Sequence, residues 1–181
     1  MTRAEPLDRD GPATAAPLTP AAVAEITGSL SAAQTVALTM WAEGRSRLEP
    51  NRGWVPNPVA AMADVANVIV NRIHDARWRR LTLKEICLQR AQFSCWLPIG
   101  GAGNYDALMR EAQQLLAGAG RGQALDACLD IAGACVAGTF RDRLDRATHY
   151  HATWTPPPRW AAPPARFVVE RWGHRFYTGV P

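Results

Sequence analysis

The residues with the clearest capacity for acid–base chemistry lie in segments far apart in the chain. One is the tripeptide Glu43-Gly44-Arg45, at the end of a strongly apolar run, and the other is a pair of His- and Tyr-bearing segments at 147–152 and 173–177. A carboxyl group that continues an apolar helix stripe loses hydration, which favours its protonated form. A protonated Glu in a cleft is the general acid that glycosidic-bond cleavage requires. The spacing also fits a surface glutamate paired with a neighbouring arginine.

The histidines allow a different chemistry. His149 and His151 point to the same side of a strand, because side chains alternate along it. Together with His174 from a neighbouring strand they could form a three-histidine zinc site. They could equally hydrogen-bond a substrate or be ordinary half-buried strand residues. The sequence contains no Walker loop, GxGxxG or HExxH motif.

The helix that carries Glu43 is predicted from its periodicity. Ser31 is a suitable N-cap, and an apolar stripe follows it at helical spacing. Glu43 comes seven residues after Val36 and three after Met40, so it extends this stripe. The stripe consists of Ala33, Val36, Ala37, Met40 and Trp41.

The remaining elements follow from caps, breakers and period. Further helices are expected at 20–28, at 59–74, at 82–89 with Thr82 as cap, from Asn104 onward, and from about 123 to a stop at Gly138. Strands are expected at 147–152, 166–172 and 174–178, with a hinge at Gly173 and a Pro-rich extended stretch at 155–164. The predicted class is α+β, mostly α: a helical domain with a small C-terminal antiparallel sheet.

A polar stripe runs along the helix at 59–74. Asp64, Asn67 and Asn71 share one side of it, separate from the apolar side. Their amide groups could face a sugar, and the alternative is a solvated helix face. Asp64 and Glu49 are also the carboxylates nearest in sequence to Glu43.

Length and charge limit the classes of protein. The 181 residues predict one domain at 21–181 after a flexible tail at 1–20. The net charge of +4 attracts anionic polymers, but the basic residues are scattered arginines, which argues against a nucleic-acid partner. No run of 18 apolar residues predicts a membrane span. The charged, Pro-broken N-terminus lacks the apolar region of a secretory signal, so delivery by another component is expected.

The four cysteines are predicted to be buried free thiols. Cys128 and Cys135 lie seven residues apart on one helix, about 10.5 Å along its axis, which is too far for a mutual disulfide. Pairing of either with Cys87 or Cys95 is the alternative.

Six short motifs occur in an order that resembles the SleB-type cell wall hydrolase family. They are Met40-Trp41-Ala42-Glu43-Gly44-Arg45, Val68-Ile69-Val70-Asn71-Arg72, Gln92-Phe93-Ser94, Ala147-Thr148-His149-Tyr150-His151-Ala152, Pro158-Arg159-Trp160-Ala161 and Gly173-His174-Arg175-Phe176-Tyr177. This family includes spore cortex-lytic enzymes and many phage-like and proteobacterial relatives. The resemblance covers roughly residues 33–178.

The resemblance implies a lysozyme-like fold, akin to lytic transglycosylases, that cleaves peptidoglycan glycan strands without a metal or cofactor. The essential acid of the family falls on Glu43. The substrate-binding positions implied are Asn71, Arg72, Gln92, Phe93, Ser94, His149, Tyr150, His151, Trp160, His174 and Tyr177. A non-catalytic wall-binding module and a zinc-dependent amidase or peptidase are the alternative functions.

Two departures from the family pattern bear on the setting. The loop at 48–58 is longer than usual, and Arg146 stands where relatives commonly carry glycine. A separate wall-binding domain, frequent in spore enzymes, is not recognisable, which favours a phage-like or gene-transfer-particle lysis factor. The protein is then expected to be made in the cytoplasm and to act on the wall, with a holin or a phage-like particle as partner.

Overall fold

The computed structural model describes residues 18–45, 58–90, 92–98 and 103–181. The predicted N-terminal tail lies outside these residues except for positions 18–20, and so does nearly all of the unusual loop at 48–58. Glu49 therefore has no described position.

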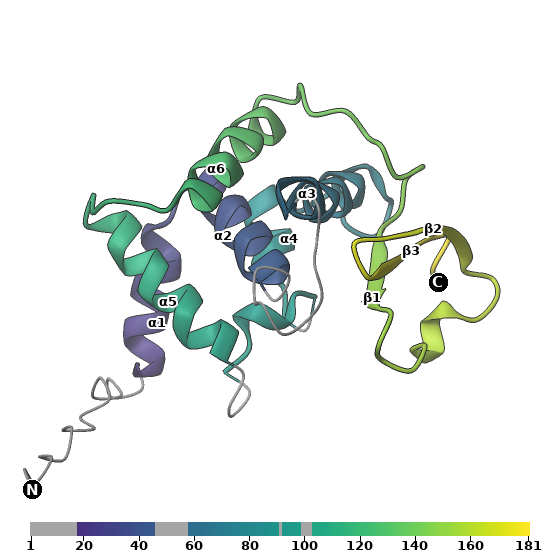
Figure 1. Cartoon of the computed structure of the whole chain (residues 1–181), viewed down its shortest axis with the longest axis horizontal. Coiled ribbons are helices and arrows are strands. Elements are labelled where there is room, and N and C mark those ends of the chain that lie inside the picture. The colour runs from purple at the N-terminus through teal and green to yellow at the C-terminus, as the bar shows by residue number, and fades with distance from the viewer. Residues whose placement is uncertain (1–17, 46–57, 91, 99–102) are drawn as a thin grey trace, which may run out of the picture.

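A helical part and a small sheet make up the described chain, with the sheet at the end away from α1 and α5 (Figure 1). The helices are α1 (Pro20–Ser29), α2 (Ala32–Arg45), α3 (Pro58–His74), α4 (Leu83–Leu88), α5 (Gly103–Leu116) and α6 (Gln123–Val136). Short 3-10 turns form η2 (Ser94–Trp96) and η3 (Arg159–Ala161). The predicted class, mostly α with a small C-terminal antiparallel sheet, is confirmed.

Local capping explains where two of the helices begin. The Ser31 hydroxyl accepts from the Gln34 N–H (3.2 Å), while the Gln34 side chain accepts from the Ser31 N–H (2.8 Å). Thr82 and Glu85 form the same reciprocal pair before α4. Each arrangement satisfies amide groups that an uncapped helix start leaves open. Asn104 was expected as a cap but lies inside α5, which already starts at Gly103.

The core of the helical part surrounds α2, which packs against α3, α4, α5 and α6. Val36, Ala37 and Met40 are fully buried, and Ala33 and Trp41 pack partly buried against the same core. The predicted apolar stripe of α2 is thus the side that the other helices cover. Gly44 is needed for this packing, because a Cβ there would lie 2.7 Å from the Met62 Cγ on α3.

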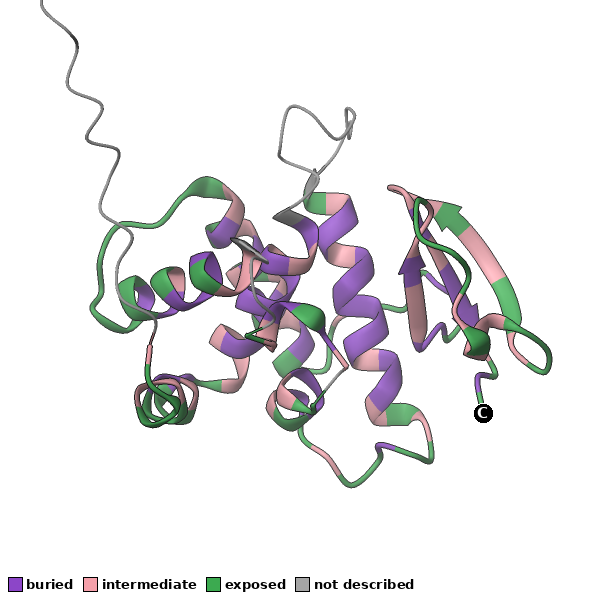
Figure 2. Ribbon diagram, turned by 90° about the horizontal axis from the view of Figure 1, so that it is seen from below, coloured by how far each residue is buried: buried purple, intermediate pink, exposed green. Residues whose placement is uncertain are grey.

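The sheet has the strand order β1-β3-β2 and is antiparallel throughout. It comprises β1 (His149–Ala152), β2 (Arg166–Arg171) and β3 (His174–Thr178). Trp172 and Gly173, both at positive φ, make the tight turn between β2 and β3. The expected extended stretch at 155–164 includes the η3 turn. One side of the sheet packs on α3, and the outermost strand carries the most exposed residues (Figure 2).

The polar stripe of α3 is buried and holds this sheet. Asp64, Asn67 and Asn71 are 4%, 0% and 6% exposed, so the expectation of a solvated helix face is wrong. Asn67 Oδ1 accepts from the Arg143 N–H (2.8 Å), and Asp64 pairs with Arg171 on β2 (3.2 Å). Residues of the sheet and of the segment that leads into it cover this side of α3. They, and not water, supply the hydrogen-bonding partners of its polar side chains.

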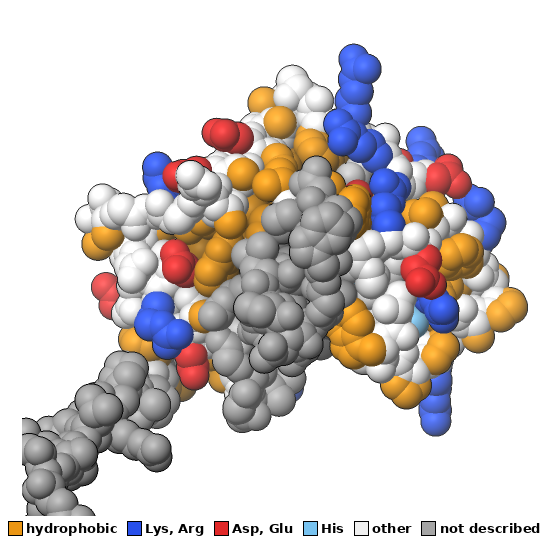
Figure 3. All heavy atoms as spheres, in the orientation of Figure 1, with side chains coloured by type: hydrophobic (Ala, Val, Ile, Leu, Met, Phe, Trp, Pro, Cys, Tyr) orange, Lys and Arg blue, Asp and Glu red, His pale blue; other side chains and the backbone are white. Residues whose placement is uncertain are grey.

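The surface and the thiols agree with the sequence predictions. Basic side chains stand on both the helical part and the sheet part of the face shown in Figure 3, among acidic ones, rather than in one stripe. None of the helices in the described ranges is long and apolar enough for a membrane crossing. Cys87, Cys95, Cys128 and Cys135 are free and buried.

Candidate active site

A cavity of about 450 Å³ lies between the end of α2, η2 and the edge strand β1. Its volume falls within the roughly 300–1,000 Å³ typical of small-molecule sites. It is lined by Glu43, Arg72, Gln92, Ser94, Leu97, His149, Tyr150, His151, Ala152, Trp160 and His174. Eight of the predicted substrate-binding residues and the predicted acid thus share one cavity.

Glu43 lines this cavity half-buried, and three donors converge on its carboxyl group. Oε1 accepts from the Cys95 backbone N–H (3.0 Å) and from the Ser94 hydroxyl (3.3 Å). Oε2 accepts from the Tyr150 hydroxyl (2.8 Å). The group is therefore held in one orientation from both walls of the cavity. Glu43 is therefore not a glutamate at an open surface, which was the alternative that the sequence allowed.

The η2 turn brings two of these donors to Glu43. Buried Phe93 precedes the turn, and the Trp96 Nε1–H donates to the Thr39 hydroxyl one turn before Glu43 on α2 (2.9 Å). This contact ties η2 to α2, so that the Cys95 N–H reaches Oε1. Burial raises the pKa of the Cys95 thiol well above its usual value, which keeps the sulfur protonated. Cys95 contributes its backbone here, not a nucleophile.

Tyr150 supplies the third donor from β1. Burial, and then the negative charge of Glu43, raise the pKa of its phenol well above the usual value. The phenol consequently stays protonated at neutral pH and can donate its proton to Glu43. Its ring packs edge-on against His174, with centroids 4.8 Å apart.

Arg72 links three parts of the site. Its Nε–H donates to the Thr148 carbonyl (2.9 Å), just before β1, and its guanidinium lies over the rings of Trp78 (5.1 Å) and Phe93 (4.9 Å). Burial lowers the pKa of this guanidinium to about 10, which still leaves it charged at neutral pH. The predicted partner motif residue Asn71 does not line the cavity. Its amide donates to Asp142 and to the Ala147 carbonyl, both at 3.1 Å.

The three histidines do not form a zinc site. His174 pairs with Ala152 across the ladder, so it shares a face with Tyr150, whereas His149 and His151 lie on the other face. No group of three His, Cys, Asp or Glu residues within the described ranges could hold a metal ion. The zinc alternative is therefore wrong for these residues, because the strand register places His174 on the opposite face of the sheet from His149 and His151.

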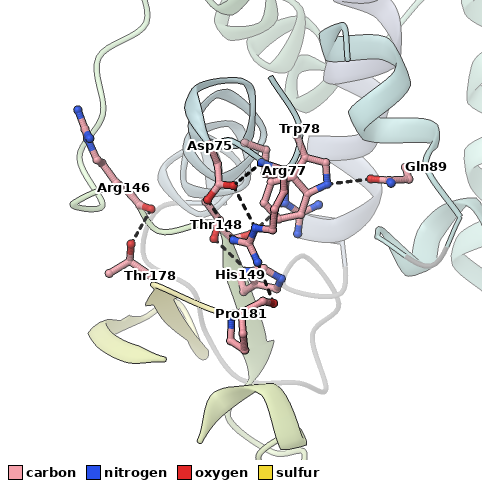
Figure 4. Close-up of polar contacts among 10 residues, drawn as sticks. Asp75, Arg77, Trp78, Gln89, Arg146, Thr148, His149, Thr178 and Pro181 are labelled. Carbon is pink, nitrogen blue, oxygen red and sulfur yellow. Dashed lines mark hydrogen bonds and ion pairs between the residues drawn. The ribbon is translucent and has the colours of Figure 1, made fainter. Parts of the chain in front are cut away.

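His149 lies against Trp78 and Trp160, beside the Asp75–Arg77 pair (Figure 4). Burial, and then the charges of Arg72 and Arg77, lower the pKa of this histidine to about 4. It is therefore uncharged at neutral pH. His151 and Tyr177 stack with their centroids 5.6 Å apart. Tyr177 and Phe93, both predicted substrate-binding residues, are buried and are not among the lining residues.

Several lining residues were not predicted. Leu97 and Ala152 line the cavity, and the Cys95 backbone contacts the acid. Ala152 belongs to the His-Tyr-His motif, whose regular strand pattern was a signal that could have included it. A backbone donor leaves no signal in a side-chain pattern.

Among the described lining residues, Glu43 is the one carboxylate. Asp64, the other nearby candidate, does not line the cavity; it is buried and paired with Arg171 on β2. Burial raises the pKa of Asp64 although Arg171 opposes the shift.

Comparison with known families adds the final observation. The family model described as Cell Wall Hydrolase matches residues 57–177, more than half of the chain. The chain belongs to the cell wall hydrolase family. Membership indicates peptidoglycan as the substrate of this SleB-type domain. No curated protein and no solved structure matches the chain.

The matched residues of this cell wall hydrolase contain α3, η2 and all of the sheet except Thr178, but they begin after α2. Glu43 is therefore outside the match, and its link to the family residues is structural: Ser94, Cys95 and Tyr150, all within the match, hold its carboxyl group.

Proposed function

We propose that this cell wall hydrolase cleaves the glycan strand of peptidoglycan, between N-acetylmuramic acid and N-acetylglucosamine, with Glu43 as the catalytic residue. The observation that supports this most is the half-buried carboxyl group at the cavity wall, oriented by Ser94, Cys95 and Tyr150. An acid used for glycosidic cleavage must sit at a cleft and keep one orientation, because proton transfer requires hydrogen-bonding reach.

Protonated Glu43 donates its proton to the glycosidic oxygen, and the bond from that oxygen to the muramyl C1 breaks. Positive charge develops on the sugar as an oxocarbenium-like state. The resulting carboxylate, stabilised by the three donors, then removes the proton of the muramyl 6-hydroxyl. That oxygen bonds to C1 and gives a 1,6-anhydro product, so no water is consumed and Glu43 regains its proton.

A lytic transglycosylase of this kind needs one carboxyl group, because acid and base act in turn. Hydrolysis with two carboxylates would need a second one across the cleft, at about 5–10 Å. Glu43 is the one carboxylate among the cavity residues that the structure describes, which favours the intramolecular reaction.

Mass spectrometry of digested sacculi tests the reaction type. The proposal expects anhydromuropeptides. Reducing muramyl ends would indicate a hydrolytic muramidase instead, and released stem peptides would indicate an amidase. Wall binding without any soluble product would make the domain a binding module and would refute the proposal.

The role of Glu43 is tested by Glu43→Gln, which keeps the shape and removes the acid. Activity on purified peptidoglycan should fall by about 10²–10⁴-fold, the usual contribution of positioned acid–base catalysis. Exposed Glu25 on α1 provides the matched control, and Glu25→Gln should keep full activity. Unchanged turnover in Glu43→Gln would remove this residue from the mechanism.

We propose a phage-like setting for this activity, as an endolysin or a gene-transfer-particle component that depends on a holin or on the particle for access to the wall. The support is the resemblance to phage-like relatives. Cytoplasmic expression with and without a holin tests it. Lysis that needs the holin agrees with the proposal, and rapid lysis without one contradicts it.

A further inference from the structure

The cavity runs along the edge of β1 rather than over one face of it. Four consecutive residues, His149 to Ala152, all line the cavity. Side chains of a strand alternate between faces, so a site above one face would be lined by every second residue. Four consecutive residues line the same cavity only where the open edge of the strand forms its wall. β1 is an edge strand, since the sheet order is β1-β3-β2.

The hydrogen-bond pattern identifies the backbone groups that face the cavity. The Thr153 N–H donates to the Gly173 carbonyl directly opposite it, so residues of odd number on β1 face β3. Residues of even number face outward. The Ala152 carbonyl agrees, because it accepts from the N–H and the hydroxyl of Thr155 instead of from β3. Thr148, just before β1, departs from this alternation, since its N–H donates to the Tyr177 carbonyl while its own carbonyl accepts from Arg72.

Three backbone groups are consequently available at this edge. They are the N–H and the carbonyl of Tyr150 and the N–H of Ala152. Among the described residues, no group outside the sheet forms a hydrogen bond with any of these three. The Ala152 carbonyl, by contrast, already accepts from the Thr155 hydroxyl (2.8 Å). The two outward N–H groups are about 6.7 Å apart along the strand.

We infer that this edge binds the stem peptide of peptidoglycan as an added strand. An extended peptide matches the three groups with alternating donors and acceptors at the strand repeat, the recognition mode called β-augmentation. A single acetamido group of a sugar can engage the Tyr150 pair but cannot reach Ala152 as well. The inference rests on the proposed function, since it assigns the peptide part of the substrate to the same cavity.

Charge supports the same occupant. Arg72 is a charged guanidinium at the cavity, and its Nη1 is a buried atom with no hydrogen-bond partner in the described structure. Stem peptides carry carboxylates, which such a cation attracts. The peptide edge also adjoins the acid, because Tyr150 presents its backbone to the peptide and its hydroxyl to Glu43. Binding the peptide therefore places the glycan beside Glu43.

Amide hydrogen exchange measured by NMR tests the inference on the Glu43→Gln protein, which leaves the ligand intact. In the free protein, the Tyr150 and Ala152 amides should exchange faster than those of His149 and His151, which face β3. A GlcNAc–MurNAc disaccharide that carries its stem peptide is then added at ten times its dissociation constant. Tyr150 and Ala152 exchange should slow about tenfold, as expected from the bound fraction.

Three comparisons decide the result. The same disaccharide without peptide should leave both amides fast, and protection by it would assign the edge to the acetamido group and overturn the inference. No protection by either ligand, or slow exchange already in the free protein, would overturn it too. Tyr150→Phe keeps every backbone group and should retain the protection. The digestion of sacculi by the wild-type protein reports separately on the proposed function, so the two can fail independently.

Discussion

The two walls of the cavity are held in place by different forces. The wall that carries Glu43 is the end of α2, which is surrounded by four helices and buried through apolar contacts. The wall that carries Tyr150 is β1, which belongs to a sheet with a much smaller apolar cluster of its own. That cluster consists of Val68, Leu144, Ala147 and Phe176, with Tyr150, Val168 and Val169 packed against it.

Polar contacts with α3 compensate for this small cluster. Asn67, Asn71 and Arg72 on α3 bond to the backbone between Arg143 and Thr148, directly before β1. Apolar packing tolerates small shifts, whereas a hydrogen bond specifies both distance and direction. The helical wall therefore supplies most of the stability. The polar seam of α3, formed by Asn67, Asn71 and Arg72, sets the position of the strand that orients Glu43.

The largest effect is expected from Asn71→Ala, which breaks the seam and leaves the helical core intact. The change leaves the buried Ala147 carbonyl without its side-chain donor, whereas exposed Asp142 keeps the N–H groups of Leu144 and Arg146. An unsatisfied buried group costs about 1–3 kcal/mol, so the free energy of unfolding should fall by that amount. Urea denaturation measures the loss.

The seam has a specific signature in the same variant. Amide exchange in 147–152 should become faster while exchange in α2 stays unchanged, and Gln114→Ala, at an exposed position on α5, serves as control. Equal acceleration in both walls would mean that Asn71 supports the whole fold rather than the strand.

The next effect is expected from Gly44→Ala, which disturbs the apolar wall. The added Cβ would lie 2.7 Å from Met62 Cγ, so α2 and α3 must separate or Met62 must move. Overpacking of this kind costs about 1–3 kcal/mol. Because Gly44 follows Glu43, peptidoglycan cleavage should drop as well.

A second substitution separates the two consequences of Gly44→Ala. Met62→Ala, which removes the Cγ at the contact, should restore part of the activity in the double variant relative to Gly44→Ala alone. Activity that stays as low as in Gly44→Ala would show that the acid is displaced by something other than this contact.

Several parts of this architecture followed from local sequence signals. The apolar stripe of α2, the Ser31 and Thr82 caps and the strand around His149 were predicted because each depends on residues within one or two turns of each other. The stop at Gly138 has the same origin, since its φ of 71° is the left-handed conformation that glycine favours.

The contacts between distant segments did not follow from the sequence. Periodicity indicated that Asp64, Asn67 and Asn71 share a face, but it cannot show what covers that face. The separation of His174 from His149 depends on the register of β1 and β3, which a single sequence does not reveal. The three donors to Glu43 come from 51, 52 and 107 residues further along the chain. Arg146 adopts a φ of 59°, so the turn before β1 takes the left-handed conformation that glycine favours although this residue carries a side chain.

A smaller effect, confined to activity, is expected from Tyr150→Phe. The ring stays in its apolar surroundings, and only the hydroxyl that donates to Oε2 is removed. Turnover should fall about tenfold, which corresponds to about 1.4 kcal/mol of transition-state free energy, with the melting temperature nearly unchanged.

Tyr105→Phe on α5 is the matched control for this change, since Tyr105 is also half-buried but is not among the residues that line the cavity. Unchanged turnover in Tyr150→Phe would limit the hydroxyl to a packing role.

The smallest effect is expected from the pH dependence of the sheet wall. The pKa of His149 is about 4 in the folded protein, below the usual 6.5, because burial disfavours its charged form. Between these two values the unfolded chain binds a proton that the folded chain does not, so stability falls as the pH drops from 6.5 toward 4. Asp64 acts in the opposite direction, since burial raises its pKa and the folded chain takes up its proton more readily.

The variant His149→Gln separates the two contributions: its melting temperature should fall less than that of the wild type as the pH drops from 6.5 toward 4. An identical pH dependence in the two proteins would mean that His149 is protonated in the fold without cost, and that the wall around it is more open than its contacts with Trp78 and Trp160 indicate.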